Sequence, residues 1–543
     1  MSKLTKGLIG LVFLVLIVIA IGFGGKRYLE NSVSEELQNW ANTSPHDFKI
    51  SFNEVNYSIK NNILLLSGVQ FRSELPVNVS QRGTQTKGTL AIDIDSMEIV
   101  QPGNDFIALL RDPTLDLSTP DLILAERMTL KGIRVEAQNP VPGVAAFSLT
   151  EDESVISEAK IRTKMVRDIL EKDSWQNALT ALPYALSWKN IHDTGMVTEI
   201  SCSTAFGRKL QSMTNRLEAR SMTRSLYRYG LLQKANLNDV SMQIDGRPLC
   251  RYDSMIIKDV MLPDQKVLAR LLTVPSDISD EEALDLFHDL LFSTGKPLAG
   301  SAVLSGLTLS SFDLPDIGIG KLSVFNTSLH PFNSEVVAEH ILLPLSIDKR
   351  LQPLRLAGLK QLDLTACFNL KGVDANNNFK LSASLNAVDL GTVDMSVSGN
   401  VPIEPIGKIL RNPTGILTEK EMAAQLNAYL GENCRIEKME MGYADEGLLP
   451  RGLKMAKSLL GLSEETCLDL AREYLAEMAD GTNIMDFEHK MDIFLRNPGA
   501  VRLAFQPGTP VPIDELGTRT DFSIDLYVNP GPKTLQELAN AIQ

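Results

Sequence analysis

The spacing of hydrophobic residues changes several times along this chain, and the first stretch, Leu8–Gly25, has no polar face at all. It consists almost wholly of Leu, Ile, Val, Phe, Ala and Gly and carries no charge. As a helix, about 18 residues rise roughly 27 Å, which matches the hydrocarbon thickness of a bilayer. The run therefore predicts a membrane anchor over residues 1–25. A cleaved secretory signal is the alternative, because small residues occur at Ala20 and Gly22.

After the anchor, a helical spacing continues only to residue 43, and apolar residues then recur at every second position. Leu29 and Val33 lie near one face of a predicted juxtamembrane helix over residues 26–43. The alternation predicts half-buried strands over residues 44–150, and it returns over residues 235–401.

A short pattern recurs in these strand regions: an aliphatic residue, one intervening residue, Gly or Asp, and then two apolar residues separated by one position. A Gly or Asp between two alternating stretches suits a β-bulge, which keeps the next apolar side chains on the inner face. The copies are irregularly spaced, so they predict long, curved, mostly antiparallel sheets rather than a solenoid of fixed period. Complete copies start at Leu66, Leu130, Leu237, Ile257 and Leu304, and Leu356–Leu359 begins a sixth.

Residues 151–234 have helical spacing and predict a helical insert between the two strand regions. Basic residues recur in it every four positions, at Arg216, Arg220, Arg224 and Arg228. Such a stripe could bind the phosphates of lipid headgroups, because each Arg presents a bidentate fork. The alternative is ion pairing with acidic neighbours such as Glu151 and Glu158.

Residues 402–543 predict a mixed, mostly helical C-terminal domain. A capping box at Thr418–Glu421 starts one helix, and further helices and short strands follow. Tyr443, Asp445 and Arg451 lie near one strand-to-helix turn, where they could be catalytic, although such a trio more often fixes the turn. The predicted fold class is α+β: an N-terminal transmembrane helix, long curved sheets with helical insertions, and this mixed C-terminal unit.

Charge and cysteine content reduce the range of functions and sites that the sequence could support. With 67 acidic and 53 basic residues the formal net charge is -14, and a field of that sign disfavours nucleic-acid binding. Five scattered cysteines include no C-x-x-C pair, so neither a zinc site nor an essential disulfide is expected. Cys202 with Cys250 is the one disulfide pairing we consider. Asp93 and Asp95 share a strand face and are interpreted as solvated, because no third metal ligand is nearby.

Recognisable catalytic motifs are missing from the sequence. It contains no nucleophile elbow, zinc-protease motif, phosphate loop or dinucleotide fingerprint. The six histidines are never at metal-ligand spacing. We therefore predict no catalytic, cofactor-binding or metal-binding residues, no cofactor, and a protein that is not an enzyme.

The anchor followed by strands of the form seen at Asn53–Phe71 resembles the AsmA-like envelope proteins of Gram-negative bacteria. The aliphatic-x-Gly-aliphatic strands at 130–135, 304–309 and 356–359 are similar too. This resemblance implies a long curved sheet with an apolar trough that carries or bridges lipid between membranes. The likeness covers residues 1–140 and 235–400 and assigns no functional residue.

These patterns together predict a single-pass protein of the inner (cytoplasmic) membrane, held by Leu8–Gly25, with its bulk in the periplasm. Its expected function is to bind or transfer lipid in envelope maintenance, with Leu307 and Leu309 in the groove and the four arginines of the insert at headgroups. The alternative is a structural or partner-binding envelope protein without lipid cargo. An open apolar sheet face would favour the first function, and a covered face the second.

Overall fold

The structure is a computed structural model with two compact units, Met1–Leu304 and Ser305–Gln543, called unit 1 and unit 2 below. Each unit is described by itself. The predicted anchor and juxtamembrane helix lie outside the described residues; within the described part of the chain, no helix is both long and apolar enough to cross a membrane. The described residues are 48–58, 61–79, 85–103, 120–141, 144–164, 181–206, 209–267, 270, 299–310, 315–329, 332–351, 354–355, 358–373, 377–402, 419–479, 486–516 and 524–529.

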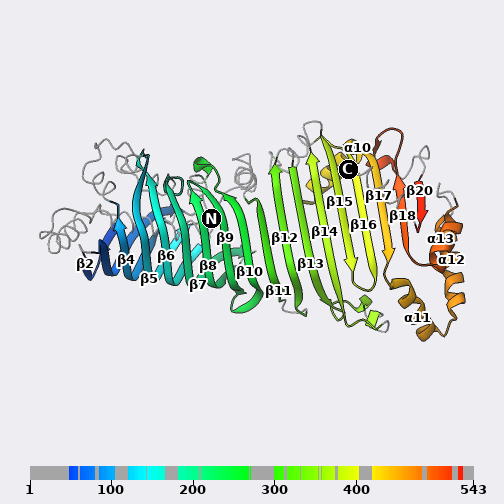
Figure 1. The fold of residues 1–543 in the computed structure, drawn as a ribbon, viewed down its shortest axis with the longest axis horizontal. Coiled ribbons are helices and arrows are strands. Elements are labelled where there is room, and N and C mark those ends of the chain that lie inside the picture. The colour runs from blue at the N-terminus through cyan, green and yellow to red at the C-terminus, as the bar shows by residue number, and fades with distance from the viewer. Residues whose placement is uncertain are drawn as a thin grey trace. The chain divides into compact units, whose positions relative to one another are not determined.

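Unit 1 is an antiparallel meander in which, from β3 to β10, each strand pairs with the next one along the chain (Figure 1). The two short strands at its start, β1 and β2, both pair with β3. The strands are β1 (Phe48–Ser51), β2 (Glu54–Ser58), β3 (Ile63–Val79), β4 (Gln85–Pro102), β5 (Asp121–Val141), β6 (Val144–Arg162), β7 (Leu186–Phe206), β8 (Lys209–Arg228), β9 (Leu231–Ile244) and β10 (Arg247–Met261).

Unit 2 continues with antiparallel pairing from β12 to β17, then from β17 to β18 and from β18 to β20. The short β19 pairs with the start of β17. Its strands are β12 (Ile317–Leu329), β13 (Phe332–Pro344), β14 (Gln361–Val373), β15 (Asn378–Ala387), β16 (Gly391–Asn400), β17 (Arg435–Asp445), β18 (Ala500–Phe505), β19 (Val511–Pro512) and β20 (Ile524–Val528). The strand β11 (Ser301–Leu309) spans the boundary between the units.

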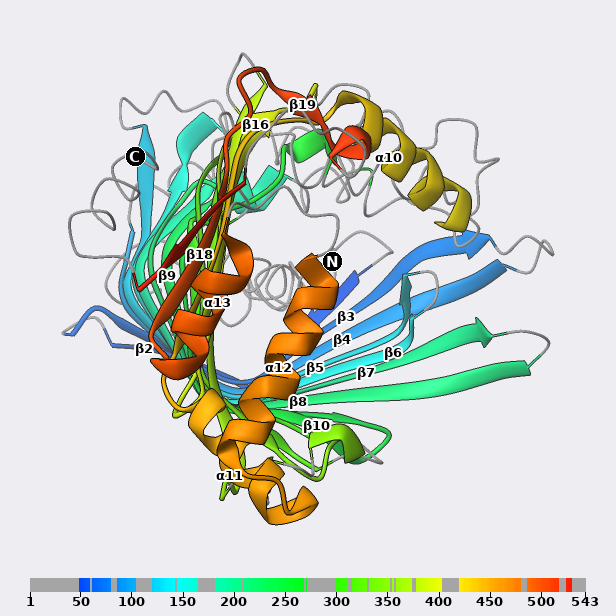
Figure 2. The same cartoon turned by 90° about the vertical axis from the view of Figure 1, so that its right-hand side faces the viewer.

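Along the chain, the helices of unit 2 are inserted between strands of its sheet. Helix α10 (Glu419–Asn433) precedes β17, whereas α11 (Leu448–Leu460), α12 (Glu464–Ala479) and α13 (Phe487–Arg496) separate β17 from β18. Helices α10 and α11 therefore lie at opposite ends of β17 (Figure 2). The predicted helices and strands of the C-terminal region are confirmed where the structure describes them. Because β16 pairs with β17 along its whole length, the predicted domain boundary between residues 401 and 402 falls inside one sheet.

The recurring Gly and Asp positions adopt the backbone that the bulge prediction requires. Gly68, Gly132, Asp239, Asp259 and Gly306 all have a positive φ inside strands. In each case the alternation of inward and outward side chains takes a three-residue step instead of a two-residue step, so the next apolar residue stays on the inner face. The prediction of bulged, mostly antiparallel strands is confirmed, except that the Gly of the sixth pattern lies in a turn before β14.

The predicted helical insert at residues 151–234 is wrong. Strands β6, β7, β8 and β9 occupy most of this stretch, and residues 165–180 lie outside the described residues. A four-residue spacing places residues on one face of a helix, but it also places them on one face of a strand, whose period is two. The spacing could not separate these two structures, and pairing with neighbouring strands favoured the sheet.

The structure describes the side chains of four of the five cysteines. Cys250, Cys367, Cys434 and Cys467 are free thiols. The backbone of Cys202 lies opposite Met213 on β8, and that of Cys250 lies opposite Met242 on β9. Strands β8 and β9 separate the two cysteines, a distance of about 14 Å at the usual strand spacing. A disulfide needs Cα atoms within about 7 Å, so the Cys202–Cys250 pairing is wrong.

Candidate functional site: an open apolar face and a basic pocket

One face of the unit 2 sheet is apolar from β12 to β20. Directly opposed residues form rows across it, for example Phe368 opposite Ala383, then Met395, then Met441. Period-two alternation places all members of a row on the same side of the sheet. The face comprises Leu322, Val324, Val336, Ala338, Leu364, Ala366, Phe368, Leu381, Ala383, Leu385, Val393, Met395, Val397, Met439, Met441, Leu503 and Leu526.

This apolar face is open in its centre. Phe368 and Leu385 are each 43% exposed, Val393 is 47% exposed and Met441 is 43% exposed. The polar residues on the opposite face of β15, such as Ser382 and Ser384, are only partly exposed. Large apolar side chains at this exposure on adjacent strands form an exposed hydrophobic surface, which makes this face a candidate binding site.

The corresponding face of unit 1 is closed. Leu66 and Met97 stand opposite each other with exposures of 2% and 1%, and Leu130, next in the same row, has none. These residues belong to one buried cluster that runs from Phe52 to Ala235. Unit 1 therefore meets the condition set above for a covered sheet, and unit 2 meets the condition for an open one.

The two predicted groove residues differ in accessibility. Leu307 and Leu309 both lie on β11, two positions apart and so on one side of the strand. Leu307 is 7% exposed, whereas Leu309 is 39% exposed. A charge at Leu307 would therefore be buried and would test folding before it tested ligand binding.

The predicted arginine stripe is divided between the two faces of β8. Ala219 and Met222 are both buried, so these inward positions are three residues apart, and Arg220 points outward between them. Arg216 pairs with Glu199 and Glu218, both at 2.6 Å, and Arg220 pairs with Asp239 at 3.4 Å. Arg228 lies exposed near the end of the strand. The ion-pairing alternative agrees with these contacts, but the partners are not those expected from the sequence.

Arg224 alone turns inward and joins a buried polar cluster in the apolar face of unit 1. Its guanidinium donates to the Asp193 carboxylate, which is fully buried and also accepts a 2.7 Å hydrogen bond from Ser154. Glu151 lies beside them, and burial followed by the Asp193 charge raises its pKa from 4.5 to about 9. At neutral pH the Glu151 carboxyl is therefore protonated. The sequence signal for this cluster is a Glu at an inward position of the alternating Phe147–Leu149–Glu151 stretch.

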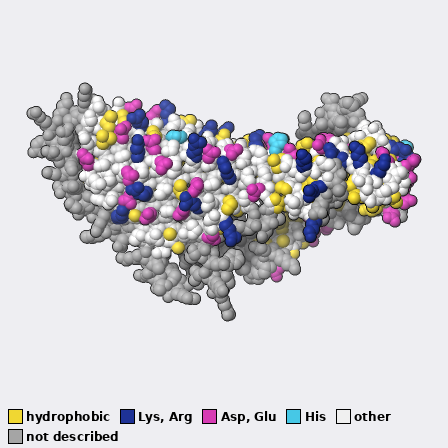
Figure 3. All heavy atoms as spheres, turned by 90° about the horizontal axis from the view of Figure 1, so that it is seen from below, with side chains coloured by type: hydrophobic (Ala, Val, Ile, Leu, Met, Phe, Trp, Pro, Cys, Tyr) yellow, Lys and Arg dark blue, Asp and Glu magenta, His cyan; other side chains and the backbone are white. Residues whose placement is uncertain are grey.

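On the outer face of unit 1, charged residues pair between neighbouring strands. Asp93 accepts from Arg72 at 2.7 Å and Asp95 from Arg134 at 2.6 Å. Basic and acidic side chains stand side by side in this way over the strands on the left of Figure 3. These two aspartates thus belong to exposed ion pairs, and among the described residues no His, Cys, Asp and Glu cluster could hold a metal ion.

The Tyr443, Asp445 and Arg451 trio fixes the turn into α11. The Tyr443 hydroxyl donates to Asp445 at 2.6 Å, and the same carboxylate accepts from the backbone N–H groups of Gly447 and Leu449. Arg451 pairs with Asp389 at 3.4 Å instead. Burial and the Asp445 charge raise the pKa of Tyr443, so its hydroxyl remains protonated and serves as a donor to the helix cap.

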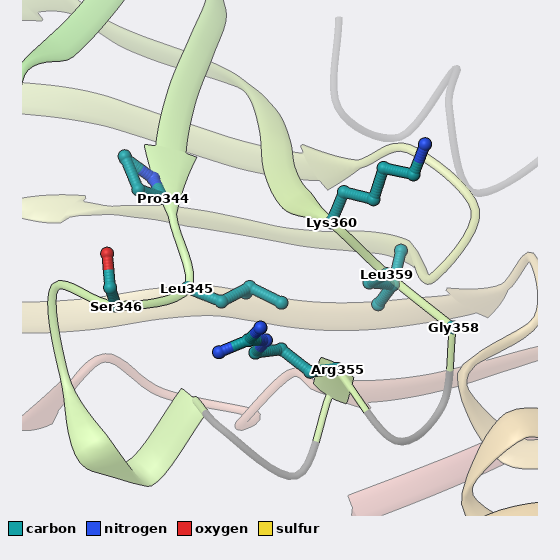
Figure 4. A pocket seen from close by; sticks show the side chains of 7 residues that line it. All are labelled: Pro344, Leu345, Ser346, Arg355, Gly358, Leu359 and Lys360. Atoms are coloured by element: carbon teal, nitrogen blue, oxygen red, sulfur yellow. The ribbon is translucent and has the colours of Figure 1, made fainter.

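A basic pocket lies where β13 ends and β14 begins. It has a volume of about 500 Å³ and is lined by Pro344, Leu345, Ser346, Arg355, Gly358, Leu359 and Lys360. Figure 4 shows the Leu345, Leu359 and Arg355 side chains meeting in its middle, whereas the Lys360 ammonium points away from the guanidinium. Among the described residues, this lining contains two cations and no carboxylate. Sequence reasoning missed this site, although residues 349–360 contain four basic and no acidic residues.

The comparisons with known proteins leave the function open. A family model described only as "Uncharacterized protein" matches residues 384–525, which run from β15 to the first residues of β20. No curated protein matches the chain. The matched stretch contains Leu385, Val393 and Met441 of the open apolar face, whereas Phe368 lies outside it.

Proposed function

We propose that this protein binds an acyl chain or a lipid on the open apolar face of unit 2, and that it acts in lipid binding or transfer for envelope maintenance. The exposure of Phe368, Leu385, Val393 and Met441 is the observation that carries the proposal. Burying apolar surface is worth about 25 cal/mol per Å², so a chain lying across several strands would gain binding free energy from many small contacts. The AsmA-like resemblance of the strand patterns supports the same function.

The location proposed with this function is the inner membrane, with Leu8–Gly25 as a single-pass anchor and the bulk of the chain in the periplasm. A lipid-binding face benefits from an anchor because the bilayer is then always within reach. A reporter that is active only in the cytoplasm, fused after Gln543, should give no signal. Strong reporter activity would contradict this topology.

The closed face of unit 1 favours a second candidate function, that of a structural or partner-binding envelope protein. Its inner residues, including Leu130 and Ile191, have no exposed surface to offer a lipid. Under this alternative the open face of unit 2 would bind a protein, and lipid would leave no trace on it.

Photocrosslinking of the full chain separates these two functions. A fatty acid carrying a diazirine in its chain should label peptides from β14 to β17, in addition to any labelling of Leu8–Gly25. The double variant Leu385→Ser with Val393→Ser should reduce labelling of β14–β17, because these directly opposed residues lie in the centre of the face. The control is Phe325→Ser, which removes a 37% exposed side chain that alternation places on the opposite face.

The labelling pattern gives a clear decision. Loss of β14–β17 labels in the double variant, with the Phe325→Ser control unchanged, supports lipid binding on this face. Labels confined to the anchor peptide in the wild-type chain would overturn the proposal and favour the structural function.

A further inference from the structure

We infer that the basic pocket between β13 and β14 is the headgroup end of the lipid site and recognises a phosphate. The inference rests on the proposed function, because it assigns the polar end of the same ligand. The shared chemistry is a phosphate group, and the lipid headgroup is the source we assign.

The pocket adjoins the apolar face along the strands. Leu343 stands opposite Leu362, and these two residues continue the inward rows toward the strand ends. Leu345 follows Leu343 by two positions, in the turn after β13, and its 2% exposed side chain is part of the pocket lining. Ala366 lies in one row with Leu385 and Val393. The extended chain from Lys360 to Ala366 is about 20 Å long. A ligand with its polar end in the pocket therefore has its apolar part over the open rows.

The charges of the pocket are uncompensated. In the part of the chain that the structure describes, neither Arg355 nor Lys360 has a carboxylate partner. Two cations of the unit 2 sheet, by contrast, are paired: Lys438 with Glu440 at 2.9 Å and Arg502 with Asp394 at 3.0 Å. In a chain with a net charge of -14, two cations that line one pocket and have no carboxylate partner among the described residues make the local potential favourable for an anion.

Arginine and lysine suit a phosphate in complementary ways. A guanidinium can donate two parallel hydrogen bonds to phosphate oxygens, and an ammonium supplies a compact positive charge. Leu345 and Leu359 in the same lining would contact the first carbons of the lipid, where a free phosphate ion would find no partner. This mixed lining favours an amphiphile over an inorganic ion.

Two photoactivatable probes with identical acyl chains test the assignment: a phosphatidic acid and a diacylglycerol, which differ only in the phosphate. The full wild-type chain should be labelled on unit 2 at a lower concentration of the phosphatidic acid than of the diacylglycerol. The variant Arg355→Gln with Lys360→Gln should need roughly tenfold more phosphatidic acid for the same labelling, since charge-assisted hydrogen bonds are lost. Its labelling by diacylglycerol should not change.

Two further variants make the result specific. Lys234→Gln with Lys258→Gln removes the same charge from opposed, exposed positions in unit 1 and should leave both probes unaffected. Arg355→Lys with Lys360→Arg keeps the charge and should retain most of the preference for phosphatidic acid, which a folding defect would not allow.

The outcomes separate the two levels of the proposal. Equal labelling by both probes in all variants would overturn the headgroup site and leave lipid binding intact. Absence of unit 2 labelling by either probe would overturn both, and calorimetric binding of inorganic phosphate that is lost in Arg355→Gln with Lys360→Gln would then assign the pocket to the free ion.

Discussion

Single residues in the buried polar cluster of unit 1 carry charge where the surrounding rows carry only apolar side chains. Asp193 occupies the same row as Leu130 and Met222, and Arg224 the same row as Ile156 and Ile191. An isolated buried charge is very costly, so such groups remain only when they are paired or neutral. Here Arg224 and Asp193 pair, and Glu151 is neutral.

Glu151 should make the stability of the protein depend on pH. The unfolded chain releases this proton near pH 4.5, whereas the folded chain holds it to about pH 9. The folded state therefore binds more protons between these values. Its contribution to stability is fully present below about pH 4.5 and is lost as the pH rises toward 9, with a slope of at most about 1.4 kcal/mol per pH unit.

The measurement is urea unfolding of the full chain at several pH values between 5 and 8. Glu151→Gln keeps the side chain neutral at every pH, so its free energy of unfolding should decline less with pH than that of the wild-type chain. Glu153→Gln, at an exposed position paired with Lys131, serves as the control. If the free energy of unfolding of Glu151→Gln declines with pH as steeply as that of the wild-type chain, the Glu151 side chain is not protonated in the folded state.

The arginines of β8 should differ sharply in their contribution to stability. Arg224→Met leaves the fully buried Asp193 without a counter-charge and should lower the free energy of unfolding by about 3–5 kcal/mol. Arg216→Gln breaks ion pairs in which both partners are about two-fifths exposed, and it should cost less than about 1 kcal/mol. Denaturant unfolding of both variants compares them directly, and equal costs would show that Asp193 is not buried.

At the scale of elements, four of the bulges of unit 1 form a row across the sheet. In this row the residues with positive φ are Gly68, Gly132, Gly195 and Asp239, on every second strand. On the intervening strands, the residues in this row are Asp95, Asp152 and Arg220. Each of these strands takes its three-residue step at this row. Inward side chains therefore move from even to odd positions, or the reverse, on all of the strands at once, and neighbouring strands stay in register.

Gly132→Ala should disturb this row more than a glycine substitution in a turn. A Cβ at position 132 would collide with the Asp95 carboxylate, and the left-handed φ of +61° is strained for alanine as well. We expect a loss of about 2–3 kcal/mol. Gly246→Ala has a similar φ of +74° but open space around it, so it should cost only about 1 kcal/mol. Thermal or urea unfolding gives both values, and their difference isolates the collision.

At the scale of the whole molecule, the same alternating strand pattern has different results in the two units. Alternating apolar residues give unit 1 a closed core, whereas in unit 2 they leave large side chains in contact with solvent. A protein rarely keeps such a surface open without using it. The difference between the units is therefore the main structural support for the proposed ligand site on unit 2.

Matched truncations should reveal this difference in stability measurements. Leu130→Ala removes a side chain with 0% exposure and should cost about 2–5 kcal/mol. Leu385→Ala removes one that is 43% exposed and should cost less than about 1.5 kcal/mol in the absence of lipid. Comparable losses in urea unfolding would show that the face of unit 2 is covered in solution.

The sequence by itself determined the strand regions at 44–150 and 235–401, the bulges at five of the six pattern positions, and most C-terminal helices. These features depend on local alternation and on backbone conformations that Gly and Asp favour, which neighbouring residues along the chain already specify. Only the tertiary structure decided that residues 186–228 form strands, since a spacing of four fits a helix and a strand equally well. It also decided that Arg224 turns inward, that Arg355 and Lys360 share a pocket, and that one apolar face is closed and the other open. Burial depends on what packs against a face, and no spacing within a strand specifies that.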